Sequence, residues 1–150
     1  MSTHAYSRLW THLIWETLSR KPMLDKRAAA KTSKFLSLYA VEKGIYMQIN
    51  YVNVDHTHAL IDLPTSICIE DVIKLLKGSS SHWINQNRII KGKFFWGRGY
   101  GAFSVSHSDV SRVARYIANQ EEHHRKHTFA EEYELFVKKY GLEWRDEGNR

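Results

Sequence analysis

The spacing of apolar and polar residues along the first half of the chain predicts one helix among three strands. Residues 6–17 alternate and are rich in β-branched and aromatic side chains, which is typical of a strand. Residues 26–44 carry Ala and Leu at helical spacing and end in a Gly that suits a helix C-cap. Residues 45–54 and 56–63 predict two more strands, joined by a turn at residues 53–55.

The second half of the chain is richer in helical patterns. Residues 69–77 predict a short amphipathic helix that ends at Gly78, with resumption through residues 79–86 as the alternative. Residues 102–107 predict a strand after a Gly-rich stretch. Two helices are expected after it: residues 108–126 with Ser108 as N-cap, and residues 128–141 with a capping box of Thr128 and Glu131 and an end at Gly141.

This order of elements, β-α-β-β-α-β followed by helices, predicts the fold class. It is the split βαβ plan, an α+β fold of the ferredoxin-like or RRM-like type with an antiparallel sheet and additional C-terminal helices. Both early helices should pack on one face of the sheet, so the other face is expected to be open and to carry a site. The length of 150 residues predicts a single domain over residues 1–150.

The cysteine count and the lack of long apolar stretches indicate the cellular compartment of the protein. Cys68 is the only cysteine, so an internal disulfide and the thiolate clusters of structural zinc sites are excluded. No stretch is long and apolar enough for a membrane span, and the N-terminal residues lack the pattern of a signal peptide. We therefore expect a cytoplasmic protein with no membrane partner.

The net charge of +6 is concentrated in one segment. Residues 72–108 contain no Asp or Glu but interleave cations with aromatic rings, which is the combination that single-stranded nucleic acid binding needs. A solvated basic face over core aromatics is the alternative. The candidate DNA-binding residues are Lys74, Lys77, Arg88, Lys91, Lys93, Arg98 and Tyr100, together with His123 near the C-terminal end of the 108–126 helix.

His56 and His58 stand one residue apart in a segment that is otherwise apolar. In a strand, residues i and i+2 share a face at about 7 Å, so two imidazoles at this spacing can converge on one ion. A strand histidine is often just a hydrogen-bonded polar group, and two imidazoles rarely hold a divalent ion without a third ligand.

The 108–126 helix offers candidates for that ligand. Its apolar face is expected to comprise Val110, Val113, Ala114, Ile117 and Ala118. At about 100° per residue, a second stripe carries Tyr116, Gln120, His123 and His127. Gln120 could act as a neutral oxygen ligand and Tyr116 as a nucleophile, or the pair could be an ordinary interfacial Tyr beside a solvated Gln.

Three stretches of the sequence together resemble a known family. They are "DHTHALIDLP" (55–64), with a His-x-His metal motif, "GRGYGAFSVS" (97–106), and "YIANQEEHHRK" (116–126), with the tyrosine and glutamine. In order and spacing they resemble the single-tyrosine HUH transposases of the insertion-sequence 200/605 type, which include REP-associated tyrosine transposases. Thr57 is less apolar than the usual middle residue of the first motif.

The resemblance implies a chemistry and a set of roles. Such enzymes cleave and rejoin single-stranded DNA at hairpins near the ends of a mobile element, through a 5′-phosphotyrosine intermediate. Tyr116 would be the nucleophile, and His56, His58 and Gln120 would bind the metal. The expected ion is Mg²⁺ or Mn²⁺, although the ligand set does not settle this because imidazole also suits zinc. A homodimer is also implied, in which the tyrosine helix of one subunit can serve the histidines of the other.

Other interpretations of these residues remain. Tyr100 is a rival nucleophile, although base stacking or turn geometry explains it better. His12 is expected to be a core histidine bonded to a neighbour, and Asp55 either orients His56 or only makes a turn. For the whole chain, the alternatives are a domesticated or non-catalytic nucleic-acid-binding module, and a protein whose histidines hold a structural metal.

Overall fold

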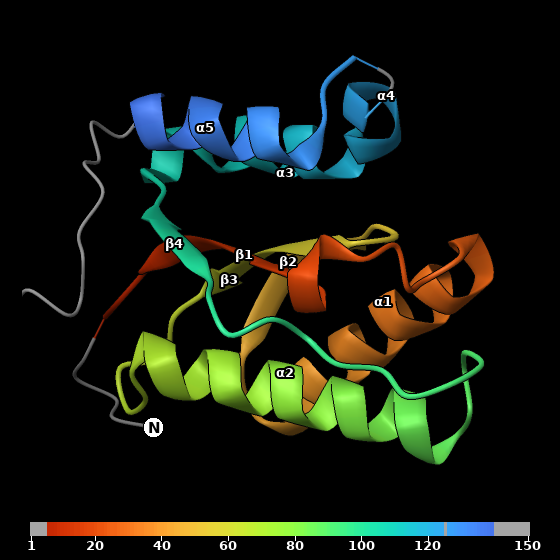
Figure 1. Ribbon diagram of the computed structural model, residues 1–150. Helices are drawn as coiled ribbons and strands as arrows, with labels where there is room; N and C mark the ends of the chain where they lie inside the picture. Colours follow the sequence, from red (N-terminus) through yellow and green to blue (C-terminus); the bar gives the residue numbers. More distant parts are fainter. Residues whose placement is uncertain (1–5, 125, 140–150) are drawn as a thin grey trace, which may run out of the picture. The chain divides into compact units, whose positions relative to one another are not determined.

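The computed structural model describes residues 6–124 and 126–139 (Figure 1). The strands are β1 (Trp10–Glu16), β2 (Tyr46–Val52), β3 (His56–Asp62) and β4 (Gly101–Ser104), and the helices are α1 (Lys26–Glu42), α2 (Ile69–Gln86), α3 (Val110–Ala118), α4 (Gln120–His124) and α5 (Phe129–Lys139). Short 3₁₀ turns, η1 (Leu18–Arg20) and η2 (His107–Asp109), connect some of them. The chain divides into two compact units, one that ends at Ala118 and one that begins at Asn119.

The first unit is built on a four-stranded sheet in the order β2-β3-β1-β4. All three strand pairs are antiparallel, and the register places Ile14 opposite His58 and Glu16 opposite His56. With its two crossover helices, this arrangement is the ferredoxin-like plan, so the predicted fold class is confirmed. The expectation of a single domain stays a prediction.

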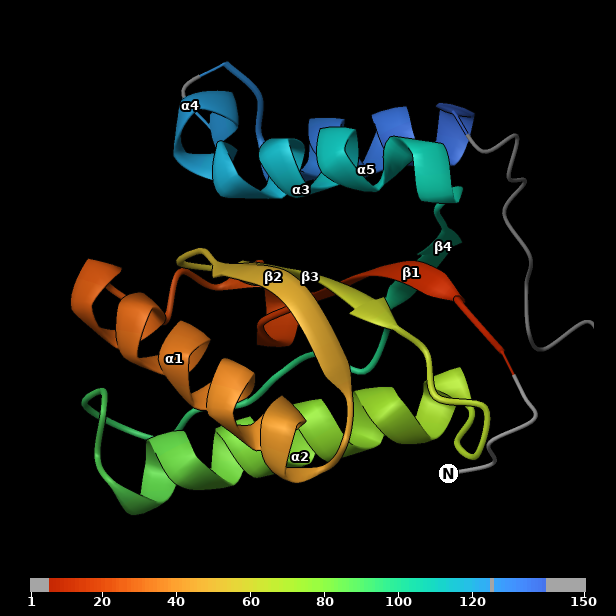
Figure 2. The same cartoon turned by 180° about the vertical axis from the view of Figure 1, so that it is seen from behind.

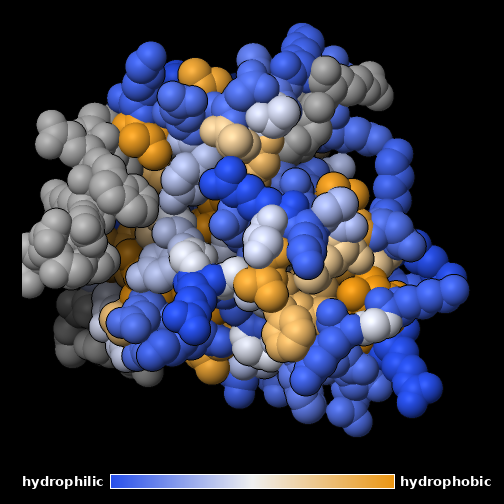
Figure 3. Space-filling model, viewed as in Figure 1, coloured by the Kyte–Doolittle hydropathy of each residue, from blue (hydrophilic) through white to orange (hydrophobic). Residues whose placement is uncertain are grey.

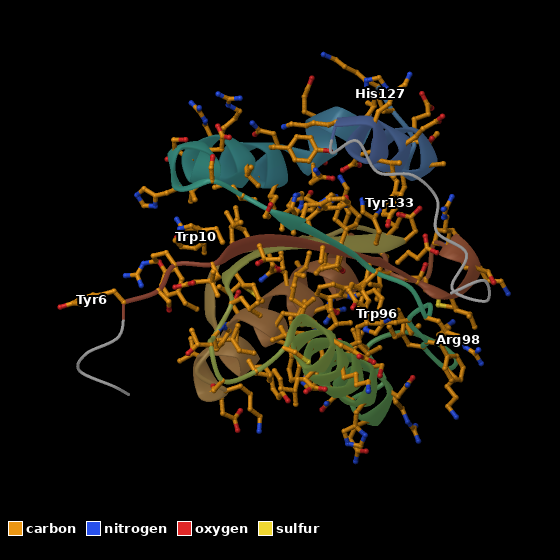
Figure 4. All side chains as sticks on the ribbon, turned by 90° about the vertical axis from the view of Figure 1, so that its left-hand side faces the viewer. Tyr6, Trp10, Trp96, Arg98, His127 and Tyr133 are labelled. Atoms are coloured by element: carbon orange, nitrogen blue, oxygen red, sulfur yellow. The ribbon has the colours of Figure 1, made fainter. Side chains whose placement is uncertain are left out.

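The sheet has a different core on each face. On one face, α1 and α2 lie side by side (Figures 1 and 2), and they pack on Leu13, Trp15, Ala59 and Ile61. The opposite face carries Leu60, which packs with Val105 of the β4–η2 connection and Ile117 of α3. Figure 4 shows the same division, with Trp96 on the α2 side of the sheet and Trp10 on the α3 side. The prediction of an open second face is wrong, because α3 supplies an apolar stripe that covers it.

Helix α2 runs past Gly78 to Gln86, so its predicted end at Gly78 is wrong, and the alternative, a helical segment over residues 79–86, is confirmed as part of one continuous helix. The helix continues because its buried side recurs at helical spacing on both sides of the glycine, in Leu76, Ser80 and Ile84. Burial of that side outweighs the cost of about 1 kcal/mol for a glycine inside a helix. The hydroxyl of Ser80 donates to the Leu76 carbonyl at 2.6 Å, which satisfies this buried polar group.

The predicted single helix over residues 108–126 is also wrong. Ser108 lies inside η2 and caps nothing, while the Ser106 hydroxyl donates to Asp109 Oδ2 at 3.0 Å. Helix α3 ends at Ala118, Asn119 is in a turn, and α4 begins at Gln120. Asn is a poor residue for a helix interior because its side chain competes for nearby backbone groups. Tyr116 and Gln120 therefore do not share one continuous helix, and Ala118 is exposed rather than part of the apolar face.

The remaining differences are in element ends. The first strand begins at Trp10 rather than residue 6, and β4 ends at Ser104 rather than residue 107. Before α5, the predicted capping box is confirmed, because Glu131 N donates to Thr128 Oγ1 at 3.2 Å and Thr128 N to Glu131 Oε1 at 3.3 Å. Gly141 lies outside the described residues. No helix in the described ranges is long and apolar enough to cross a bilayer.

Candidate functional site

His56 and His58 lie at the beginning of β3 and point to the same face of the sheet, as predicted. Both are fully buried, their ring centroids are 5.1 Å apart, and a ring nitrogen of one lies within 4.8 Å of a ring nitrogen of the other. The strand pleat dictates this, because Leu60, two residues further on, packs on α3, whereas Ala59 and Ile61 pack on the opposite face.

Each of the two imidazoles has a polar neighbour at its Nδ1 atom. Asp55 Oδ1 lies 2.7 Å from His56 Nδ1, and His12 Nε2 lies 2.9 Å from His58 Nδ1. His12 comes from β1, diagonally across the ladder from His58, and is itself buried. The expectations for Asp55 as an orienting residue and for His12 as a bonded core histidine both match this geometry. What the sequence did not reveal is that the partner of His12 is a member of the histidine pair.

The donor set fits a divalent metal. Ligating histidines commonly give their second nitrogen to a carboxylate or another acceptor, which fixes the tautomer and the ring orientation. Here the Nδ1 atoms are engaged by Asp55 and His12, which leaves the Nε2 atoms as the natural ligand atoms. The Asn53 amide lies 3.2 Å from His56 Nε2, so a metal at this nitrogen would have to displace that contact.

Tyr116 lies beside one member of the histidine pair, His58. Its ring centroid is 6.0 Å from that of His58 and 6.4 Å from that of His12, in edge-on arrangements. The tyrosine is half-buried, and Ile117, the next residue along α3, is fully buried against Leu60. Packing of the apolar stripe of α3 therefore brings a phenol on this helix to one imidazole on β3, that of His58, and to the imidazole of His12 on β1.

The other proposed ligand belongs to the second unit. Gln120 is the first residue of α4, which follows the turn at Asn119. His123 lies in the same short helix, but its side chain is not among those that the structure describes. The structure thus brings together His56, His58 and Tyr116, and the roles of Gln120 and His123 stay predictions.

Most of the candidate DNA-binding cations lie on α2 or in the loop that follows it. Lys74 is exposed and forms an ion pair with Glu70 at 3.4 Å. Lys77 is different, because its ammonium donates to the Gly97 carbonyl at 2.5 Å, and burial lowers its pKa despite the opposing effect of Glu16. Arg88, Lys91, Lys93 and Arg98 are exposed.

The aromatic residues of this segment divide between the core and the surface. Phe94, Trp96 and Phe103 are buried, and the Trp96 indole donates to Ser80 Oγ at 2.9 Å. Phe95 and Tyr100 stay 45% and 41% exposed, so within this loop and β4 only these two rings are available for stacking.

Comparison with known proteins agrees with this geometry. Residues 5–120 match the family model for IS200-like transposases. Among solved structures, the chain is 26% identical to a candidate transposase from Deinococcus radiodurans, with a TM-score of 0.60, over 80% of this chain and 96% of the other. A REP-associated tyrosine transposase bound to a REP hairpin has the same fold at 12% identity, with a TM-score of 0.53, over 83% of this chain and 74% of the other. No curated protein matches the sequence.

The family match spans both histidines of β3 and the tyrosine of α3, whose rings lie together in the first unit. The chain belongs to the IS200-like transposase family.

Proposed function

We propose that this protein is a metal-dependent transposase that cleaves and rejoins single-stranded DNA through a covalent 5′-phosphotyrosine, with Tyr116 as the nucleophile. The observation that supports this most strongly is the 6.0 Å separation between the rings of Tyr116 and His58, which lie 58 positions apart in the sequence. A purely structural histidine pair would have no need of a phenol beside it.

His56 and His58 would bind the metal through their Nε2 atoms, and we assign Gln120 as a third, neutral oxygen ligand on the basis of its family motif. The amide oxygen suits Mg²⁺ or Mn²⁺, the ions that the family resemblance implies, whereas imidazole also suits zinc, so the ligand set alone does not select the metal. When bound, such an ion would polarise the scissile phosphate as a Lewis acid.

The residues of this chain would carry the covalent steps. The Tyr116 oxygen attacks the phosphorus in line, its proton passes to solvent, and the bond from phosphorus to the 3′-oxygen breaks. That oxygen takes up a proton and leaves as a 3′-hydroxyl, while the 5′-phosphate stays on Tyr116. In rejoining, another 3′-hydroxyl attacks the phosphotyrosine and the phenol leaves. Because each step exchanges one phosphodiester for another, no nucleotide cofactor is needed.

We propose single-stranded DNA with a hairpin as the substrate and a homodimer as the active form. The REP-associated tyrosine transposase at 12% identity is bound to a REP hairpin, which supports the substrate class. The dimer, in which the tyrosine helix of one subunit serves the histidines of the other, rests on the family resemblance.

The test is an adduct assay. Hairpin-bearing oligonucleotides from the flanks of the gene are incubated with the protein and Mg²⁺ or Mn²⁺, and DNA-linked protein is detected under denaturing conditions. We expect an adduct that Tyr116→Phe and chelation abolish, whereas Tyr6→Phe, which removes a 96% exposed hydroxyl outside the site, should leave it unchanged. An adduct that survives in Tyr116→Phe would refute the assignment.

The assay also separates the two alternatives. A non-catalytic nucleic-acid-binding module would bind the oligonucleotides but give no adduct with any metal. A structural metal site would make chelation lower the melting temperature sharply, whereas a catalytic site should lose activity with the fold intact.

A further inference from the structure

A groove lies on the α1–α2 side of the sheet, away from the face that carries Tyr116. Its volume is about 1070 Å³, and it is bounded by the segment before α1, the β2–β3 turn and the loop after α2. Met23, Val54, Ile89 and Ile90 give it an apolar floor, and Arg88, Lys91 and Lys93 line its rim. We refer to it as the basic groove. The space-filling view in Figure 3 shows apolar side chains among hydrophilic ones on this face of the molecule.

Hydrogen bonds hold the walls of the basic groove in place. After α2 the chain turns back with Arg88 at a φ of 50° and Gly92 at 78°, and Ile89 N donates to the Ile84 carbonyl at 3.0 Å. The Asn85 side chain then fixes the returning loop, because it accepts from Phe94 N at 2.7 Å and donates to the Phe94 carbonyl at 3.0 Å. The groove is thus preformed rather than a gap in a loose loop.

The charges of the basic groove favour a polyanion. None of Arg88, Lys91 and Lys93 makes an ion pair within the residues that the structure describes, and Lys93 only lies over the ring of Phe95 at 5.3 Å. The one carboxylate in the lining is Asp25, and its Oδ1 already accepts from Ala28 N at 2.7 Å as the N-cap of α1. Three cations therefore face solvent around an apolar floor with little to neutralise them.

The groove is tied to the candidate metal site through the β2–β3 turn. Leu24 N donates to the Val54 carbonyl at 3.1 Å, which fixes one wall of the groove to this turn. The next residue, Asp55, contacts His56 Nδ1. The groove and the histidine pair are therefore at the same end of the sheet, on opposite sides of a turn of three residues.

We infer that the basic groove binds an unpaired stretch of the DNA substrate, the single strand that leads to or from the cleaved phosphate. Cations on the rim would contact phosphates, and the apolar floor would pack against unstacked bases, which duplex DNA does not expose. This inference rests on the proposed function in one respect, namely that single-stranded DNA is the substrate.

The test compares binding of a hairpin that carries a single-stranded tail with binding of the same hairpin without the tail. Fluorescence anisotropy is measured with chelator present and in a Tyr116→Phe background, so that cleavage does not interfere. The groove variant is Arg88→Gln, Lys91→Gln and Lys93→Gln. Its matched control removes the same charge from exposed cations of α1 and its C-cap, outside the groove: Lys31→Gln, Lys34→Gln and Lys43→Gln.

For single-stranded DNA, log K falls with log salt concentration, and each phosphate contact contributes about 0.7 to the steepness of that fall. Three lost contacts should therefore lower the slope by about 2 and weaken binding of the tailed hairpin on the order of 50-fold at 0.15 M salt. The tailless hairpin and the control variant should change much less. Val54→Ser, at a partly exposed position, should weaken tail binding without changing the salt slope.

If the groove variant and the control variant lose the same affinity for the tailed hairpin, general charge attraction explains the loss and the inference is overturned. Unchanged DNA affinity in the groove variant would also overturn it. Either result leaves the adduct assay untouched, because that assay reports on Tyr116 and the metal. A failed adduct assay with intact tail-dependent binding would instead remove the proposed function and keep a DNA-binding groove.

Discussion

His12 should determine how well the candidate site binds its metal, although it is not itself proposed as a ligand. For His58 to offer Nε2 to an ion, its Nδ1 must carry the proton and donate it to His12 Nε2, 2.9 Å away. His12→Phe keeps a ring of similar shape and removes the acceptor. A buried donor that loses its partner costs about 1–3 kcal/mol. This agrees with the 10–100-fold loss of metal affinity that is typical when such an orienting residue is removed.

The assay is a Mn²⁺ titration followed by electron paramagnetic resonance, with thermal melting as the check on folding. We expect His12→Phe to raise the Kd for Mn²⁺ by about 10–100-fold. His12→Gln should restore part of the loss, because its amide oxygen can accept from His58 Nδ1. In the metal-free protein, ¹⁵N chemical shifts should show His58 protonated at Nδ1. Unchanged Mn²⁺ affinity in His12→Phe, or His58 protonated at Nε2, would refute the positioning role, and an equal loss in both variants would indicate packing alone.

Further predictions concern the parts of the fold that position the site. Ile117→Ala should cost about 2–5 kcal/mol in urea unfolding, because it opens a cavity between α3 and Leu60; a loss near zero would mean that this contact does not anchor α3. Gly78→Ala should stabilise the protein by about 0.5–1 kcal/mol, since an added Cβ meets nothing within 4 Å and α2 is continuous there; destabilisation would contradict the regular helix. Burial lowers the pKa of Lys77, so between that pKa and its ordinary value the unfolded chain binds more protons. The free energy of unfolding should therefore rise with pH across this window, and Lys77→Met should abolish the part of the rise that is due to this lysine. If the free energy of unfolding depends on alkaline pH in the same way in both proteins, the burial of Lys77 is contradicted.

The topology of the first unit could be predicted because its signals are local. Alternation in β1 and β3, helical spacing in α1 and a clear turn before His56 each identify an element, and the antiparallel split βαβ plan leaves few ways to assemble them. The predicted helix ends were wrong where a local signal in the sequence competes with burial of the helix. Gly78 looks like a helix end, but the buried Leu76 and Ile84 carry the helix through it.

The site was predictable in part for a similar reason. The strand period alone places His56 and His58 on one face, whereas their meeting with Tyr116 depends on how α3 packs on the sheet, which no spacing encodes. The prediction that Tyr116 and Gln120 share one helical stripe requires a continuous helix, whereas the helix is interrupted at Asn119. The contact between His12 and His58 depends on the register of β1 against β3, which the sequence pattern does not determine.

We propose that Tyr116 becomes covalently attached to DNA at a metal site that includes His56 and His58. The most direct measurement is mass spectrometry of the trypsin-digested protein–DNA adduct. Arg115 and Arg125 bracket the tyrosine, so trypsin should release residues 116–125 as one peptide. We predict that this peptide carries the nucleotide on Tyr116, only when Mg²⁺ or Mn²⁺ is present, and that His58→Ala removes the modification without unfolding the protein. A nucleotide on any other residue, or its formation in the presence of chelator, would contradict the claim.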